Sequence, residues 1–380
     1  MLQIDYRLND DDLKEYCAMV EKLIGDDDAL EKSNLLCGDF YKFITDNGYR
    51  SYDAIQKHID NLKLLGRKYA ELNAMLTLEH EQITEVVEFL DAAFIQNELD
   101  RMNLEARTLK LANTPLRSYN DLRKRREQLK SGANRFYPII RKEIIYDQWH
   151  LRFSHFIAAY SAFPGMEINQ WIVNKTDTRV CPYCNLTYVY NRKKHTTAQL
   201  DHFFSNSIYP MFALGFYNLI PSCPACNRIK SDNNKELASP YDEDVFSDVR
   251  ITWYPSKPTG DVHSDWSLTN IEKNIEIAIE TVNPRVENNM SSMEISAAYS
   301  NHLDYASEVI AKVRTYMNPE AQELIRKTCL DMGITPEDIE RFYFANYTGT
   351  KKIKNRPLAK LTNDFIEEYK ASVGKYEDFF

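Results

Sequence analysis

The chain has 380 residues, 43% of them hydrophobic, and a formal net charge of −9. This length and apolar share are enough for a buried core and suggest two or three domains. No stretch approaches the roughly 18 uncharged apolar residues that cross a bilayer, and the acidic N-terminal segment lacks the features of a secretory signal, so we expect a cytoplasmic protein with no membrane partner.

The charge is distributed unevenly along the chain. Residues 1–100 carry 22 acidic and 10 basic side chains, a balance of −12, whereas residues 101–150 carry 5 acidic and 12 basic ones, a balance of +7. A polyanion responds to the local sign of charge, because salt screens charges beyond about 8–10 Å. The basic cluster Arg123–Arg126 is therefore either a solvated helix face or a phosphate-binding patch.

Helical periodicity dominates the N-terminal part of the chain. Asp10–Asp12 can cap a helix that runs to about Ile24, Ser51 precedes a second apolar stripe, and a third covers about residues 81–110. The apolar residues of the second and third stripes are Ile55, Ile59, Leu62, Leu65, Ile83, Val86, Val87, Leu90, Ala93 and Phe94. We expect a helical region over residues 1–135, whose stripes face the core or a docked partner.

Short runs that favour β-structure follow in the central part. Thr187–Tyr190 and Thr196–Leu200 flank a basic turn and predict a hairpin, and residues 227–237 predict a helix. Residues 136–174 are ambiguous between strand and helix. We expect a central unit over residues 136–245.

The C-terminal part begins with alternating apolar and polar residues, which are typical of half-exposed strands. These predicted strands cover residues 251–255 and 274–282, and helical periodicity then returns at residues 286–317, 319–332, 336–344 and 358–372. We assign residues 246–380 to a small β segment followed by a helical region. The whole pattern predicts an α+β protein that is predominantly α-helical, with the central unit embedded between helical regions.

The seven cysteines include two CxxC pairs, Cys181–Cys184 and Cys223–Cys226, separated by 38 residues. Two such pairs can place four sulfurs about 2.3 Å from one zinc ion, and four thiolates leave no open position, so this zinc would be structural. A reactive dithiol or an iron–sulfur cluster is the alternative. Cys17, Cys37 and Cys329 lie among apolar residues and are interpreted as core thiols, since an odd count argues against a disulfide framework.

Residues suited to metal-assisted phosphodiester hydrolysis lie between the cysteine pairs and just after them. Asp201 and His202 end the predicted hairpin, Asn218 follows in a loop, and Asn227 comes directly after the last cysteine. A neutral imidazole, with an ordinary pKa of about 6.5, can act as a general base near pH 7. Carboxylate and amide oxygens are suitable ligands for Mg²⁺. A single histidine is more simply a core residue, but its combination with the other three favours catalysis.

The string LDHFFSNSIYP, followed by FYNLIPSCPACNRIKSD and flanked by the CxxC pairs, resembles the ββα-metal motif of HNH endonucleases. The resemblance covers about residues 181–230 and implies a nuclease core stapled by zinc. It assigns His202 as the general base and Asn218 as the residue that orients the histidine-bearing loop. It also implies that Asp201 and Asn227 bind a catalytic Mg²⁺, with Mn²⁺ as an alternative.

Basic side chains around this motif would contact the nucleic acid. The resemblance implies that Lys230, together with Arg228, meets the scissile or an adjacent phosphate, and Lys193 and Lys194 in the basic turn are further candidates. His195 is either another phosphate contact or an exposed loop residue. We expect DNA as the substrate. RNA or tRNA is the alternative, because the chemistry does not use the 2′-hydroxyl and the motif therefore does not separate DNA from RNA. A zinc module that binds nucleic acid or protein without catalysis is the competing hypothesis.

The placement of the motif between helical regions, together with the run Arg356–Phe365, resembles the HNH subunits that accompany ATPases in antiphage systems of the Septu type and in some retrons. This resemblance implies a role in antiviral defence. It also implies that a separate ATPase subunit is a partner and that the acidic N-terminal helices form its docking surface.

Overall fold

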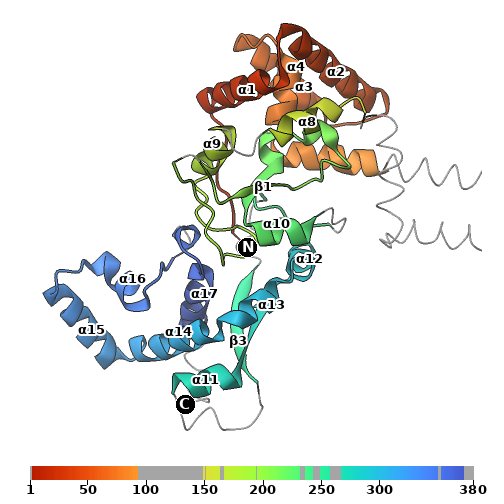
Figure 1. Ribbon diagram of the computed structural model, residues 1–380. Helices are drawn as coiled ribbons and strands as arrows, with labels where there is room; N and C mark the ends of the chain where they lie inside the picture. Colours follow the sequence, from red (N-terminus) through yellow and green to blue (C-terminus); the bar gives the residue numbers. More distant parts are fainter. Residues whose placement is uncertain are drawn as a thin grey trace, which may run out of the picture.

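The computed structural model describes residues 2–92, 149, 151–162, 167–193, 195–231, 236–242, 249–256, 267–349 and 352–371. Figure 1 shows N-terminal helices at the top, a central unit with short strands below them, and a C-terminal region at the lower left. The expected predominance of helix with a few small strands is confirmed. Within the described ranges, none of the helices has the length and apolar character to span a bilayer. The Arg123–Arg126 cluster and the boundary expected near residue 135 lie outside these ranges.

Four helices and the helical residues 80–92 form the N-terminal region. The four are α1 (Asp10–Ile24), α2 (Asp27–Asp46), α3 (Tyr52–Leu64) and α4 (Ala70–Thr77). The predicted bounds of the first helix are confirmed, but its cap is Asn9, whose Oδ1 accepts hydrogen bonds from the backbone N–H groups of Asp11 and Asp12. The capping side chain must precede the first turn. The aspartates instead lie within that turn, where the positive end of the helix dipole favours them.

The two further stripes predicted in this region face the core. Ile55, Ile59, Leu62, Ile83, Val86, Val87 and Leu90 are buried. Leu65 lies one residue beyond the end of α3 and is partly exposed, because the chain there turns away at Gly66, whose φ is +73°. Ala93 and Phe94, at the end of the third stripe, lie outside the described residues.

The central unit places two short strands and a helix next to one another. Its elements are α8 (Ser154–Ser161), α9 (Glu167–Lys175), β1 (Gln199–His202), η2 (Pro210–Phe212), η3 (Phe216–Asn218), β2 (Leu219–Ser222) and α10 (Pro224–Lys230). Strands β1 and β2 are antiparallel, with Asp201 opposite Ile220 and His202 opposite Leu219. Helix α10 follows β2 after one residue and contacts β1. The order is therefore strand, strand, helix.

Two details of the central prediction are wrong. The helix predicted to reach residue 237 ends at Lys230, because Ser231 has a left-handed φ of 44°. In place of the hairpin predicted around the basic turn, the structure has an isolated bridge there, which joins Asn191 to Thr196. The strand that carries Asp201 pairs with β2 instead, whose four residues are all buried.

The C-terminal region contains a two-stranded sheet and a set of helices. Its elements are β3 (Arg250–Pro255), α11 (Leu268–Asn274), β4 (Ile275–Glu280), α12 (Pro284–Ser292), α13 (Ile295–Tyr299), η5 (Ser300–His302), α14 (Leu303–Tyr316), α15 (Pro319–Asp331), η6 (Pro336–Asp338), α16 (Ile339–Phe344), η7 (Ile353–Asn355) and α17 (Ala359–Ala371). Both predicted strands are confirmed, and they pair with each other. The helix predicted over residues 286–317 is interrupted at Glu294, which has a left-handed φ of 53°.

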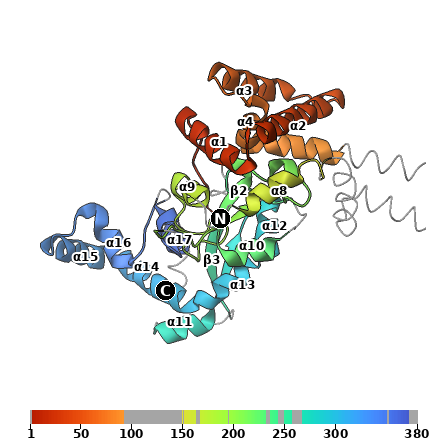
Figure 2. The same ribbon diagram turned by 45° about the horizontal axis from the view of Figure 1, so that its top comes forward.

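A single hydrophobic cluster joins the three regions. The buried side chain of Tyr16 in α1 packs on Phe216 of the central unit, and its hydroxyl donates to the carbonyl oxygen of Leu214 at 2.8 Å. The N-terminal residues cross the same unit, since the backbone N–H of Leu2 donates to the carbonyl of Pro182 at 2.7 Å. The rotated view in Figure 2 keeps the N-terminal helices beside α8 and α9. The interpretation of Cys17, Cys37 and Cys329 as buried core thiols is confirmed.

Candidate metal centre and its neighbours

The four cysteines of the CxxC pairs form one buried cluster. Their sulfurs all lie within 4.8 Å of one another, and the Sγ atoms of Cys184 and Cys223 are 4.0 Å apart. A tetrahedral zinc ion with bonds of about 2.3 Å separates its sulfur ligands by about 3.8 Å. Burial and the neighbouring sulfurs raise the pKa of the Cys181 thiol, so its thiolate form needs a positive charge at the centre of the cluster. The cluster could hold a zinc ion, as the spacing predicted.

Local backbone structure explains how each pair presents its sulfurs. Cys223 caps α10, and its Sγ accepts the backbone N–H of Cys226 at 3.4 Å, with Pro224 in the first helical position. In the other pair, Cys184 Sγ accepts the backbone N–H of Leu186 at 3.4 Å. Both pairs therefore direct backbone N–H groups at sulfur, which stabilises the thiolate that a metal requires.

The C-terminal region fixes the first cysteine pair from outside. Asn185 has a left-handed φ of 55°, and its backbone and side-chain oxygens accept the N–H groups of Leu358 and Lys360. The hydroxyl of Tyr299 donates to the carbonyl oxygen of Cys184 at 2.8 Å. The Arg356–Phe365 run that the sequence singled out thus supports the backbone next to Cys184.

Asp201 is buried, with 3% of its surface exposed, beside the four-cysteine cluster. The hydroxyl of Tyr183, which lies between Cys181 and Cys184, donates to its Oδ2 at 2.7 Å. The Nζ of Lys230 lies 3.1 Å from each carboxylate oxygen. Burial raises the pKa of Asp201, while the Lys230 ammonium and the Tyr183 hydroxyl act in the opposite direction. The carboxylate thus already has one positive partner.

Lys230 is itself buried, with 2% of its surface exposed. Its ammonium also donates to the carbonyl oxygen of His202 at 2.8 Å. It therefore lies inside the central unit, away from the surface at which a phosphate could meet it. Arg228 and Lys193 are exposed, and Lys194 lies outside the described residues.

The ring of His202 is fixed on the other side of β1. Its Nε2 lies 2.9 Å from the carbonyl oxygen of Ala213. A carbonyl oxygen only accepts hydrogen bonds, so Nε2 carries the proton, and Nδ1 is the nitrogen with the lone pair in the neutral ring. The ring of Tyr160 packs 4.1 Å away between centroids, and its hydroxyl donates to the carbonyl of Leu200 at 2.6 Å. Strand and imidazole are thus held by the same tyrosine.

Asn218 is fully buried and fixes the loop that follows His202. Its Oδ1 accepts the backbone N–H of Phe204 at 2.7 Å, and its Nδ2 donates to the carbonyls of Phe204 and Phe212, each at 3.0 Å. Three hydrogen bonds therefore connect the start and end of this loop through one amide.

Asn227 lies where α10 meets β1. Its Nδ2 donates to Oε1 of Gln199 at 2.8 Å. Alternate residues of a strand share a face, so Gln199 and Asp201 both lie on the side of β1 that contacts α10. The structure therefore brings Asn227, Asp201 and Lys230 to one strand–helix contact and directs His202 to the opposite side.

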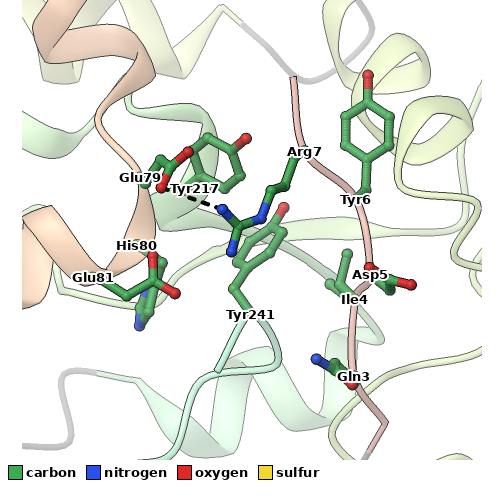
Figure 3. Close-up of a pocket in the computed structure, with 10 residues that line it drawn as sticks. All are labelled: Gln3, Ile4, Asp5, Tyr6, Arg7, Glu79, His80, Glu81, Tyr217 and Tyr241. Atoms are coloured by element: carbon green, nitrogen blue, oxygen red, sulfur yellow. Dashed lines mark ion pairs between the residues drawn. The ribbon is translucent and has the colours of Figure 1, made fainter. Parts of the chain in front are cut away.

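A separate pocket lies where the N-terminal segment crosses the loop before β2. Figure 3 shows Arg7 reaching toward Glu79 near the rings of Tyr217 and Tyr241, and the ion pair between Arg7 and Glu79 spans 3.6 Å. The Tyr217 hydroxyl accepts the backbone N–H of Leu8 at 2.8 Å. None of the predicted site residues lines this pocket. The hydrogen bond between Leu8 and Tyr217 anchors the segment before α1 to the chain next to Asn218.

Three contributing residues were missed by the sequence reasoning: Tyr160, Tyr183 and Gln199. The position of Tyr183 inside the first CxxC pair was a usable signal, because a residue between two cluster cysteines must lie near the cluster. The other two carry no local signal.

Comparison of the chain with protein-family models, curated proteins and solved structures finds no match.

Proposed function

We propose that the chain is a metal-dependent endonuclease that hydrolyses phosphodiester bonds, with DNA as the favoured substrate. The supporting observation is the fixed imidazole of His202 at the end of β1, whose Nε2 donates to the carbonyl of Ala213. The order of strand, strand and helix after a cysteine pair also supports it, since this is the order that the resemblance implies.

His202 would act as the general base. Its Nδ1 takes a proton from a water molecule, and the resulting hydroxide attacks phosphorus, so the P–O3′ bond breaks and the product carries a 5′-phosphate. The Nε2–H bond to Ala213 is kept throughout and stabilises the imidazolium that forms. Asn218 and Tyr160 are positioning residues, since they hold the loop and the strand on either side of this ring.

Asp201 and Asn227 would hold the catalytic Mg²⁺ or Mn²⁺. When bound, such an ion neutralises charge on the phosphate and on the leaving oxygen. The donor chemistry is suitable, because both side chains offer oxygens and the buried carboxylate already binds a positive group, the Lys230 ammonium. The ion would replace or share that contact. Because the His202 ring leaves β1 on the opposite side, the base and the ion would reach the phosphate from the two sides of the strand's end.

The biological setting follows from the weaker resemblance. We propose an effector role in antiviral defence, with a separate ATPase as partner docked on the acidic N-terminal helices. Copurification of an ATPase with the full chain from its host supports this setting, and rapid cutting by the isolated chain counts against it.

The decisive experiment compares nicking of a supercoiled plasmid by the wild-type chain and by His202→Ala, with and without added Mg²⁺. Omitting the ion is preferable to adding a strong chelator, because a chelator also removes zinc. The matched control is His302→Ala, in η5. We expect Mg²⁺-dependent nicking by the wild type and the control, and none by His202→Ala at unchanged zinc content. Equal nicking by His202→Ala contradicts the assignment.

One observation favours a second candidate, a zinc module without catalysis. The buried ion pair of Asp201 and Lys230 stabilises the strand–helix contact without any further ion. This candidate predicts that the wild-type chain does not cut DNA or RNA under any metal condition.

A further inference from the structure

Two exposed tyrosines lie side by side just before β1. Tyr188 and Tyr190 are 43% and 40% exposed, while Val189 between them is fully buried. Alternate residues of an extended chain point to the same side, so the two rings share the outer face. Their centroids are 5.9 Å apart, with an interplanar angle of 77°. Water therefore contacts two adjacent aromatic rings on one face of the chain.

The turn beside these rings carries positive charge. The guanidinium of Arg192 lies 5.9 Å from the centroid of the Tyr190 ring, and Lys193 and His195 in the same turn are exposed. Residues 185–200 contain three basic side chains and neither aspartate nor glutamate. Exposed rings bordered by cations are complementary to a base and its phosphate.

The aromatic face is held rigidly by the backbone. Thr197 donates its backbone N–H to the carbonyl of Tyr190 at 3.0 Å, and the backbone N–H of Arg192 donates to the carbonyl of His195. Asn191 donates from Nδ2 to the carbonyl of Gln170 in α9 at 2.6 Å. Two residues after Thr197 the chain enters β1, the strand that carries the candidate base. The residues of this aromatic face therefore lie close along the chain to the strand that carries the proposed general base.

We infer that Tyr188 and Tyr190, with Arg192 and Lys193, form a stacking platform for the unpaired bases of single-stranded nucleic acid. This inference rests on the proposed nuclease function and specifies its substrate class. Paired bases are covered by their neighbours in a duplex, whereas an unpaired base exposes the flat face that an aromatic ring can contact.

The test measures binding of the full-length, zinc-loaded chain to short fluorescent oligonucleotides without added Mg²⁺, by anisotropy. The oligonucleotides are single-stranded DNA, single-stranded RNA and duplex DNA of one sequence. We expect tighter binding to a single strand than to the duplex. The double variant Tyr188→Ala/Tyr190→Ala should bind the single strand at least about fivefold more weakly. The double Phe variant should bind as the wild type does, because it keeps both rings.

The matched control is Tyr254→Ala, which removes an equally exposed tyrosine, 44% accessible, from β3. Arg192→Ala should instead reduce the salt dependence of single-strand binding. The slope of the logarithm of the binding constant against the logarithm of the salt concentration should become less steep by about 0.7. Unchanged single-strand affinity in the double Ala variant, or duplex binding as tight as single-strand binding, overturns the platform. Plasmid nicking with Mg²⁺ separates the two proposals. If the wild type nicks the plasmid but the double Ala variant binds a single strand as tightly as the wild type, the platform alone is refuted. If the wild type neither binds nucleic acid nor nicks the plasmid, both proposals are refuted.

Discussion

The hydroxyl of Tyr183 donates a 2.7 Å hydrogen bond to Oδ2 of Asp201, and both residues are buried. Tyr183 is also the third residue of the first CxxC pair, so its backbone is fixed by Cys181 and Cys184. The cysteine cluster therefore positions the candidate catalytic carboxylate directly.

Replacing Tyr183 with Phe removes this hydrogen bond and keeps the ring. We expect the variant to lose about 1–3 kcal/mol of unfolding free energy, because the buried carboxylate loses a donor. Urea denaturation measures the loss, and elemental analysis should show the same zinc content as the wild type. An unchanged denaturation midpoint would mean that the bond contributes nothing.

Loss of one cluster sulfur should remove the metal. Structural zinc sites supply folding free energy of roughly 10 kcal/mol or more, so Cys223→Ser is expected to be zinc-free and to unfold the central unit. The control is Cys329→Ser, which changes a buried thiol outside the cluster and should keep its zinc. Zinc analysis and circular dichroism on both variants check this. A folded Cys223→Ser with full zinc content is incompatible with a four-sulfur site.

Removing the charge of the buried Lys230 should strongly destabilise the fold. Lys230→Met leaves the Asp201 carboxylate without its charge partner and should cost about 3–5 kcal/mol. Adding Asp201→Asn should restore part of that loss, because the neutral amide needs no cation. Lys193→Met, at an exposed lysine, should change stability by no more than about 0.5 kcal/mol. If Lys230→Met is as stable as the Lys193 variant, the ion pair is not formed in solution.

Asn218 should control the order of the loop between Phe204 and Phe212. Asn218→Ala leaves two carbonyls and one N–H without their partner, and unsatisfied buried groups cost about 1–3 kcal/mol each. Hydrogen exchange should therefore speed up across this loop. Asn227→Ala, which removes one partly exposed bond, is the comparison variant and should leave the loop protected. Equal exchange in both variants would argue against the clamp.

The lowered pKa of Asp242 should make the stability of the fold depend on pH in the acid range. Burial alone would raise its pKa, but the hydrogen bond from His80, the charge of His80 when it is protonated and the charge of Arg285 together outweigh burial and lower it. A lowered pKa in the folded state stabilises the fold above the unfolded pKa of about 3.9, and this stabilisation is lost as the pH falls through the folded value. Asp242→Asn should therefore lower the melting temperature at pH 7, and the difference from wild type should shrink below about pH 4. A difference independent of pH contradicts this linkage.

The local features of this protein could be predicted from its sequence. Helix α1, strands β3 and β4 and each CxxC pair follow from spacings of two to four residues, which determine which side chains share a face or can bind one ion. The end of α10 could not be predicted in this way, because it depends on one left-handed residue, Ser231.

The sequence alone predicted that four sulfurs meet, which the structure confirms, and it fixed the order Asp201, His202, Asn218 and Asn227 along the chain. Only the tertiary structure decided that Lys230 pairs with Asp201 inside the molecule, and that β1 pairs with β2. The physical reason is that partners 29 residues apart along the chain are chosen by which groups leave water together. A buried carboxylate requires a nearby cation and donor, and only the folded chain determines which side chains supply them.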